Sequence, residues 1–180
     1  MKKILIVCLT LVLFSCGRYG EKYVEHRATE NNQSIPLTDS INLYDNIYDL
    51  EKKGLVMENE EGEWVIPSVT IANVEFSDVS LTLSKEDKVI LASYRGPYDL
   101  SPEERKAEFD SLYAHFISTY GDPQTIKEED NSCFVTWKFG DETFGESISL
   151  SYNNPKKNDY IVVGSLNIDI KNTAWMTITK

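Results

Sequence analysis

The chain has 180 residues, of which 18 are lysine or arginine and 29 are aspartate or glutamate, so its formal net charge is −11. A surface this acidic argues against nucleic acid as a partner and against electrostatic adhesion to anionic lipid. The three cysteines and two histidines lack the spacing of metal-ligand motifs, so the sequence predicts no metal and no cofactor.

The first residues have the pattern of a secretory signal. Lys2 and Lys3 precede an apolar run over residues 4–14, which is shorter than the roughly 20 apolar residues that a bilayer span needs. Ser15 then supplies the small residue that precedes a cleavage point. We therefore expect residues 1–15 to be a signal peptide.

The end of this signal carries a more specific motif. Leu13-Phe14-Ser15-Cys16 resembles the lipobox of bacterial lipoproteins, although Phe14 is bulkier than the usual residue. The resemblance implies diacylation of the Cys16 thiol, cleavage after Ser15 and acylation of the new amino terminus. Several acyl chains anchor a protein stably, whereas one holds only marginally. The alternative is a plain signal peptide with an incidental cysteine.

The same resemblance implies a location in the bacterial cell envelope, with the membrane as a partner through the lipid on Cys16. Gly17 follows that cysteine where an aspartate would signal retention in the inner membrane, so the outer membrane is favoured. Residues 16–38 are polar and show no apolar period, which predicts a flexible tether. Residues 39–180 are then expected to form a single domain.

The first helix is predicted over residues 41–53. Leu43, Ile47 and Leu50 recur at helical spacing, and such a stripe is typical of an amphipathic helix. Gly54 follows at the position where glycine commonly ends a helix.

A second helix is predicted over residues 102–120. Ser101 can cap it, Pro102 suits its first turn, and Glu104 lies at the capping-box position. Gly121 marks its end. The apolar residues that form one stripe along it are Phe109, Leu112, Tyr113, Phe116, Ile117 and Tyr120.

Alternating apolar and polar residues predict antiparallel strands in the rest of the domain. The expected strands cover residues 64–66, 69–76, 79–84, 89–94, 133–139, 148–152 and 160–170. Pro67 is expected to end the first of them. Cys133 shares a strand face with Val135 and Trp137, so we interpret it as a small buried hydrophobe and not as a reactive thiol.

Both halves of the domain run from a helix through a glycine to several strands. This order predicts an α+β fold in which an antiparallel sheet of six to eight strands carries both helices on one face, as a tandem helix-plus-strands repeat. At the level of fold, the pattern resembles the helix-and-sheet repeats of beta-lactamase inhibitor protein and of the small outer-membrane-assembly lipoproteins. Such a likeness does not specify a function.

No catalytic set is evident in the sequence, so the leading hypothesis is a non-catalytic envelope protein. Its open sheet face or its loops would bind another envelope component, either a protein or a glycan. Tyr94, Tyr98, Tyr152 and Tyr160 fall near predicted strand ends and are candidate contact residues. The alternatives are an inhibitor, a carrier of a small ligand, and a glycan-acting hydrolase with paired carboxylates.

Overall fold

The computed structural model describes residues 35–140, 145–154 and 164–172. They belong to a compact unit that spans Ile35–Lys180. The expected signal peptide, Cys16, Tyr160 and most of the expected tether lie outside the described residues. The last tether residues do not: Ile35 and Leu37, which were expected to belong to the tether, are buried.

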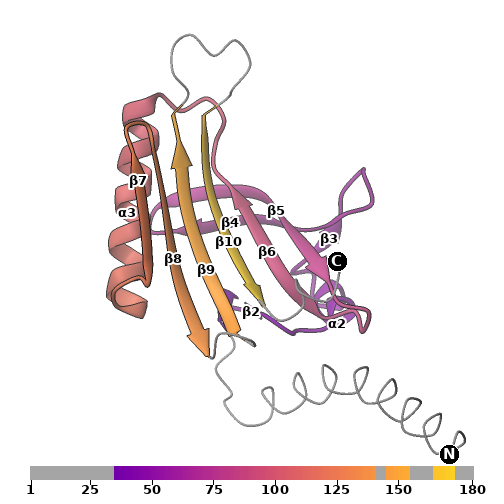
Figure 1. Ribbon diagram of the computed structural model, residues 1–180. Helices are drawn as coiled ribbons and strands as arrows, with labels where there is room; N and C mark the ends of the chain where they lie inside the picture. Colours follow the sequence, from indigo (N-terminus) through magenta and orange to yellow (C-terminus); the bar gives the residue numbers. More distant parts are fainter. Residues whose placement is uncertain (1–34, 141–144, 155–163, 173–180) are drawn as a thin grey trace, which may run out of the picture. The chain divides into compact units, whose positions relative to one another are not determined.

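The domain contains two helices and ten strands among the described residues (Figure 1). Their bounds are β1 (Pro36–Thr38), β2 (Ile41–Asn42), α2 (Ile47–Lys52), β3 (Met57–Glu58), β4 (Trp64–Ile71), β5 (Val74–Leu83), β6 (Val89–Arg95), α3 (Pro102–Tyr120), β7 (Thr125–Glu129), β8 (Ser132–Gly140), β9 (Gly145–Asn153) and β10 (Ser165–Asn172). In this described part, no helix is both long and apolar enough to cross a membrane.

Eight of the strands form one open antiparallel sheet in the order β3-β4-β5-β6-β10-β9-β8-β7. Each helix is followed by four strands that pair in succession, and the last strands of the two sets, β6 and β10, pair with each other. The predicted α+β class, the antiparallel sheet and the number of strands are therefore confirmed, and the element order is that of the expected repeat.

Helix α3 has both of the ends that the sequence predicts. The Ser101 hydroxyl accepts from the backbone N–H of Glu104, and the Glu104 carboxylate accepts from the backbone N–H of Ser101. The second of these bonds lowers the pKa of the Glu104 carboxyl. The helix covers one face of the sheet, where Phe109 meets Tyr152 of β9 with a 4.7 Å separation of ring centroids.

The prediction for the first helix was wrong at its start. Ile41 and Asn42 form β2, and Tyr44 has a φ of 73°, which an α-helix does not accommodate. The helix begins only after Asn46, whose side chain accepts from the backbone N–H of Tyr48. The buried residues of α2 join the same core as those of α3.

Pro67 does not end a strand, as the sequence had suggested. Strand β4 continues through it to Ile71, and Ile66 and Ser68 on either side of it both pair with β5. Because β3 pairs only with Trp64 and Val65, Pro67 lies on an edge segment, where a missing N–H is tolerated. The expected strand over 69–76 is instead split by a turn at residues 72 and 73, both with positive φ.

The core lies between α3 and the sheet, and the β4–β5 hairpin extends it. This hairpin passes behind β6 and β10 in Figure 1 and reaches α3, where the Ser111 hydroxyl donates to the Ala72 carbonyl over 3.0 Å. Phe76 on β5 is fully buried against Tyr94 of β6. The hairpin therefore acts as a second cover on the face that α3 covers only in part.

Cys133 lies in this core, as the alternation of its strand predicts. Burial raises the pKa of its thiol, and the nearby Glu128 carboxylate raises it further. Because the thiolate is the reactive form, we expect iodoacetamide to alkylate Cys133 at least about tenfold more slowly in the folded protein than in guanidinium chloride. Peptide mass spectrometry separates it from the other cysteines. Equal rates in the two conditions would contradict this placement.

Candidate functional site

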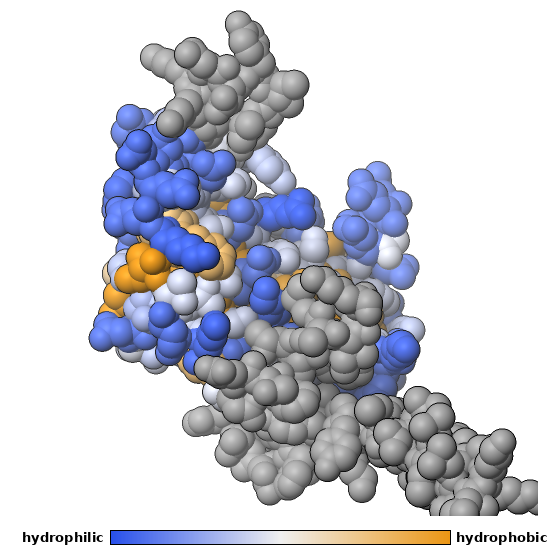
Figure 2. Space-filling model, viewed as in Figure 1, coloured by the Kyte–Doolittle hydropathy of each residue, from blue (hydrophilic) through white to orange (hydrophobic). Residues whose placement is uncertain are grey.

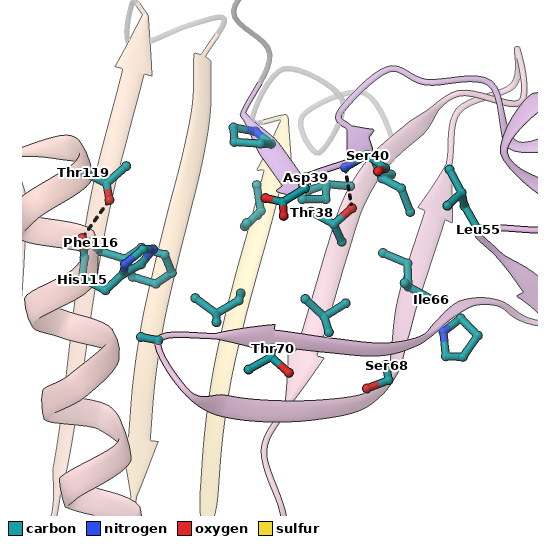
Figure 3. A pocket seen from close by; sticks show the side chains of 18 of the residues that line it. Thr38, Asp39, Ser40, Leu55, Ile66, Ser68, Thr70, His115, Phe116 and Thr119 are labelled. Atoms are coloured by element: carbon teal, nitrogen blue, oxygen red, sulfur yellow. Dashed lines mark hydrogen bonds between the residues drawn. The ribbon is translucent and has the colours of Figure 1, made fainter. Parts of the chain in front are cut away.

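A groove of about 730 Å³ lies on the covered face of the sheet. It lies where α3 and the β4–β5 hairpin leave a gap between them (Figure 3). We call it the α3–β4 groove. Most of its lining residues come from four parts of the chain, which are residues 36–41, residues 54–55, residues 66–72 and the second half of α3. Ile170 of β10 also lines it.

The floor of the groove is apolar. Ile170, Phe116 and Val69 all line it, and each is buried within the core. They come from β10, α3 and β4, respectively, so the floor is formed only when the sheet, the helix and the hairpin are in place. A concave apolar site of this volume is typical of pockets for small molecules.

Two walls face each other across this floor. In Figure 3, His115, Phe116 and Thr119 come from α3 on the left, and Leu55 and Ile66 lie on the right. The bond from the Ser111 hydroxyl to the Ala72 carbonyl joins the hairpin tip to α3. Trp137 holds the other end of the helix, because its indole N–H donates to the Gly121 carbonyl over 2.8 Å.

Polar groups surround the mouth of the groove. The Thr119 hydroxyl donates to the His115 carbonyl over 2.9 Å, and the Thr38 hydroxyl oxygen accepts from the backbone N–H of Ser40 over 3.1 Å. Figure 3 shows the Asp39 carboxylate on the β1–β2 turn, pointing toward the side on which α3 lies. The groove thus combines an apolar floor with a rim that can exchange hydrogen bonds with a polar head group.

The groove lining contains an acidic side chain but no lysine or arginine among the described residues. Asp39 supplies the carboxylate of the groove. The wall formed by α3 is the last part of that helix, which carries the negative end of the helix dipole and has no basic residue in its final turn. Burial raises the pKa of Tyr120, which also lines the groove, so its hydroxyl stays neutral.

A smaller pocket of about 360 Å³ lies elsewhere, near the start of β5 and the end of β6. Glu63, Glu75 and Asp78 line it together with Arg95 and Tyr98. The described residues contain no group of three or more histidine, cysteine or acidic side chains placed to hold a metal ion. This pocket is therefore a polar surface hollow with mixed charge.

The structure does not bring the four candidate tyrosines together. Tyr94 is fully buried, and its hydroxyl donates to the Leu37 carbonyl, while Tyr152 is buried against Phe109. Burial also raises the pKa of Tyr94. Tyr98 is 64% exposed and lines the smaller pocket. Tyr160 lies outside the described residues, so Tyr98 is the described member of the four that a partner could reach.

Two other apolar side chains are exposed on β7 and β8, the last two strands in the order of the sheet. Phe134 of β8 is 40% exposed and Ile126 of β7 is 54% exposed. Figure 2 shows apolar side chains over β7 and β8 with hydrophilic residues around them. Phe134 is the neighbour of the buried Cys133 in β8, and the alternation of the strand places the two side chains on opposite faces of the sheet.

The carboxylate pair of a hydrolase has no counterpart in the described part of the groove. Glu108 is a carboxyl group whose pKa is raised, by burial first and by the neighbouring Glu104 second. It lies on α3 and lines neither of the two pockets described here. The groove itself offers the single carboxylate of Asp39.

Sequence reasoning did not find the groove. Its residues are far apart in the chain, and most of them have patterns that predict ordinary core or turn positions. Comparisons of the chain with protein-family models, with curated proteins and with solved structures find no match.

Proposed function

We propose that this protein is a non-catalytic, lipid-anchored envelope protein that carries a small amphipathic ligand in the α3–β4 groove. The observation that supports the proposal is the groove itself, which has a volume of about 730 Å³, an apolar floor and a polar rim. Lipidation at Cys16, and with it the envelope location, rests on the lipobox and remains a prediction. The anchor would keep the groove close to a membrane, where amphipathic molecules are concentrated.

The size of the expected interaction follows from the area of apolar surface that a ligand would bury. Each buried methylene group contributes about 0.8 kcal/mol, so a six-carbon chain gains at most about 5 kcal/mol. Because that gain is an upper limit, the dissociation constant is expected to be no lower than about 0.2 mM. A short, water-soluble probe should therefore bind weakly but saturably.

The test uses the full chain in phosphatidylcholine nanodiscs, with hexyl glucoside as the probe and saturation-transfer NMR as the readout. We expect saturable binding above that of empty discs. A tryptophan on either wall, introduced by Thr119→Trp on α3 or by Leu55→Trp on the opposite side, should fill part of the groove. Binding should then weaken at least about tenfold, because the hexyl group of the probe loses contact with the floor. Ile126→Trp is the matched control, since Ile126 is exposed and lies outside the groove.

Thermal unfolding of each variant shows whether it is folded. If one of the two wall variants fails to fold, the other still tests the proposal. Binding that equals that of empty discs, or that neither wall variant changes, would contradict the proposal.

A second candidate function is partner binding through the open sheet face or through the loops. The observation in its favour is the exposure of Phe134 on that face and of Tyr98 on the loop that follows β6. Exposed aromatic side chains are frequent at protein interfaces. If probe binding were independent of the groove, this face would be the better-supported site.

A further inference from the structure

The charges at the rim carry information about the head group of the ligand. We propose that the α3–β4 groove selects amphiphiles with a cationic head group over neutral ones and disfavours anionic ones. This inference rests on the proposed function, because it specifies the class of ligand that the same groove holds. If the groove has this preference, fatty acids, alkyl sulfates and phosphorylated lipids are not its preferred ligands.

The first supporting observation is the Asp39 carboxylate. Asp39 is exposed on the β1–β2 turn and lines the groove, and Figure 3 shows its carboxylate directed toward the side of α3. A cationic head group at the rim would lie close to it while the alkyl chain occupied the floor. An exposed ion pair of this kind contributes up to about a fivefold change in affinity.

The second observation is independent of Asp39. His115, Phe116, Thr119 and Tyr120 are the residues through which α3 lines the groove, and all of them belong to its last two turns. The carbonyl groups at the end of a helix carry partial negative charge and favour cations. Because no lysine or arginine occurs in the last turn of α3, this negative end is not neutralised by the helix itself.

The third observation concerns what an anionic head group would meet. Among the described residues, no lysine or arginine lines the groove, so a carboxylate or sulfate would find no ammonium or guanidinium group there to pair with. The chain as a whole carries a formal net charge of −11, which lowers the local concentration of anions and raises that of cations. All three observations point in the same direction.

The experiment compares three probes that share one hexyl chain, namely hexyltrimethylammonium, hexyl glucoside and hexanesulfonate. The protein is the full chain in zwitterionic phosphatidylcholine nanodiscs, so that the bilayer does not itself select by charge. We expect the ammonium probe to bind about fivefold more tightly than the glucoside, and the sulfonate to bind more weakly than both. The preference should shrink as the salt concentration rises from 20 to about 500 mM.

Asp39→Asn is the decisive variant. It should reduce the ratio of ammonium to sulfonate affinity by about fivefold, and any change in hexyl glucoside affinity should be smaller than that. Asp99→Asn is the matched control, because Asp99 is an exposed aspartate outside the groove and its loss changes the net charge by the same amount.

The two proposals fail in different ways. Equal affinities for the three probes, with Leu55→Trp still blocking all of them, would overturn the charge preference and leave the carrier function standing. An equal effect of Asp39→Asn and Asp99→Asn would also overturn it, because it would assign the preference to net charge alone. Absence of saturable binding by any probe would overturn both.

Discussion

Replacing Trp137 by alanine is expected to destabilise the domain by about 3–5 kcal/mol. The Trp137 side chain is fully buried, and its ring lies 5.6 Å from that of Phe116 and 6.0 Å from that of Tyr113, measured between centroids. Its indole N–H donates to the Gly121 carbonyl. Truncation would thus remove the largest side chain between β8 and α3 and leave a cavity that close-packed neighbours fill only in part.

The measurement is guanidinium-induced unfolding of the full chain, followed by far-UV circular dichroism. Trp137→Phe separates the two contributions, because it keeps an aromatic ring in the core but removes the bond to Gly121, and it should cost about 1–2 kcal/mol. Trp64→Ala is a matched control, since Trp64 is only half-buried on β4, in edge contact with Tyr48. A loss below about 1 kcal/mol for Trp137→Ala would be incompatible with this packing.

The same variants connect stability to the groove. Gly121 ends α3, and the helix residues that line the groove lie within the two turns before it. Trp137→Phe leaves the ring contact that positions Phe116 largely in place, so probe binding should survive in this variant while stability falls. The bond from Trp137 to Gly121 is therefore a support for the helix and lies outside the groove itself.

The sequence predicts α3 well because the signals at both of its ends are local. Ser101, Pro102 and Glu104 act within one turn of each other, and Gly121 needs no distant partner to end the helix. The first helix was harder to predict for the opposite reason. Leu43 has the spacing of a helical residue, but pairing of β2 with β1 holds the chain extended before it, and that pairing is not visible in the helical period.

The burial of Tyr152 could have been predicted from the sequence, although we interpreted this residue as a contact residue. Tyr152 alternates with Ile148 and Leu150, which the strand pattern assigns to the core, so its burial follows from the same period of two. The position of Pro67 inside a strand, by contrast, could not be predicted from the local sequence. A proline ends a central strand but not an edge strand, and the position of β4 near the edge depends on the order of all eight strands.

The groove could not be predicted from the sequence because it is a property of tertiary packing. Leu55, Val69 and Ile170 look like ordinary core residues in the sequence, and only the curl of the β4–β5 hairpin toward α3 leaves a gap beside them. The charge of the rim likewise depends on which helix end reaches the gap. Periodicity determines which face of an element is apolar, but it does not determine whether that face is filled.

The second large effect is expected at Gly164, just before β10. Arg105 is buried there, and its guanidinium donates to the Asn154 side-chain oxygen over 2.6 Å and to the Leu100 carbonyl over 2.7 Å. A Cβ atom added at Gly164 would collide with this guanidinium. Because the guanidinium is held from two sides, it cannot move away freely, and Gly164→Ala should cost about 1–3 kcal/mol by overpacking.

A double-mutant cycle with Arg105→Met makes this prediction specific, because the sign of the alanine effect should then reverse. The φ of Gly164 lies outside the left-handed region, so alanine is compatible with its backbone, and such a substitution stabilises by about 0.4–1 kcal/mol when nothing obstructs it. With the guanidinium removed, Gly164→Ala should therefore be neutral or stabilising, which corresponds to a coupling energy of about 1–3 kcal/mol. Unfolding of the four proteins in denaturant measures that coupling. Additive effects would mean that the buried arginine does not rest on Gly164.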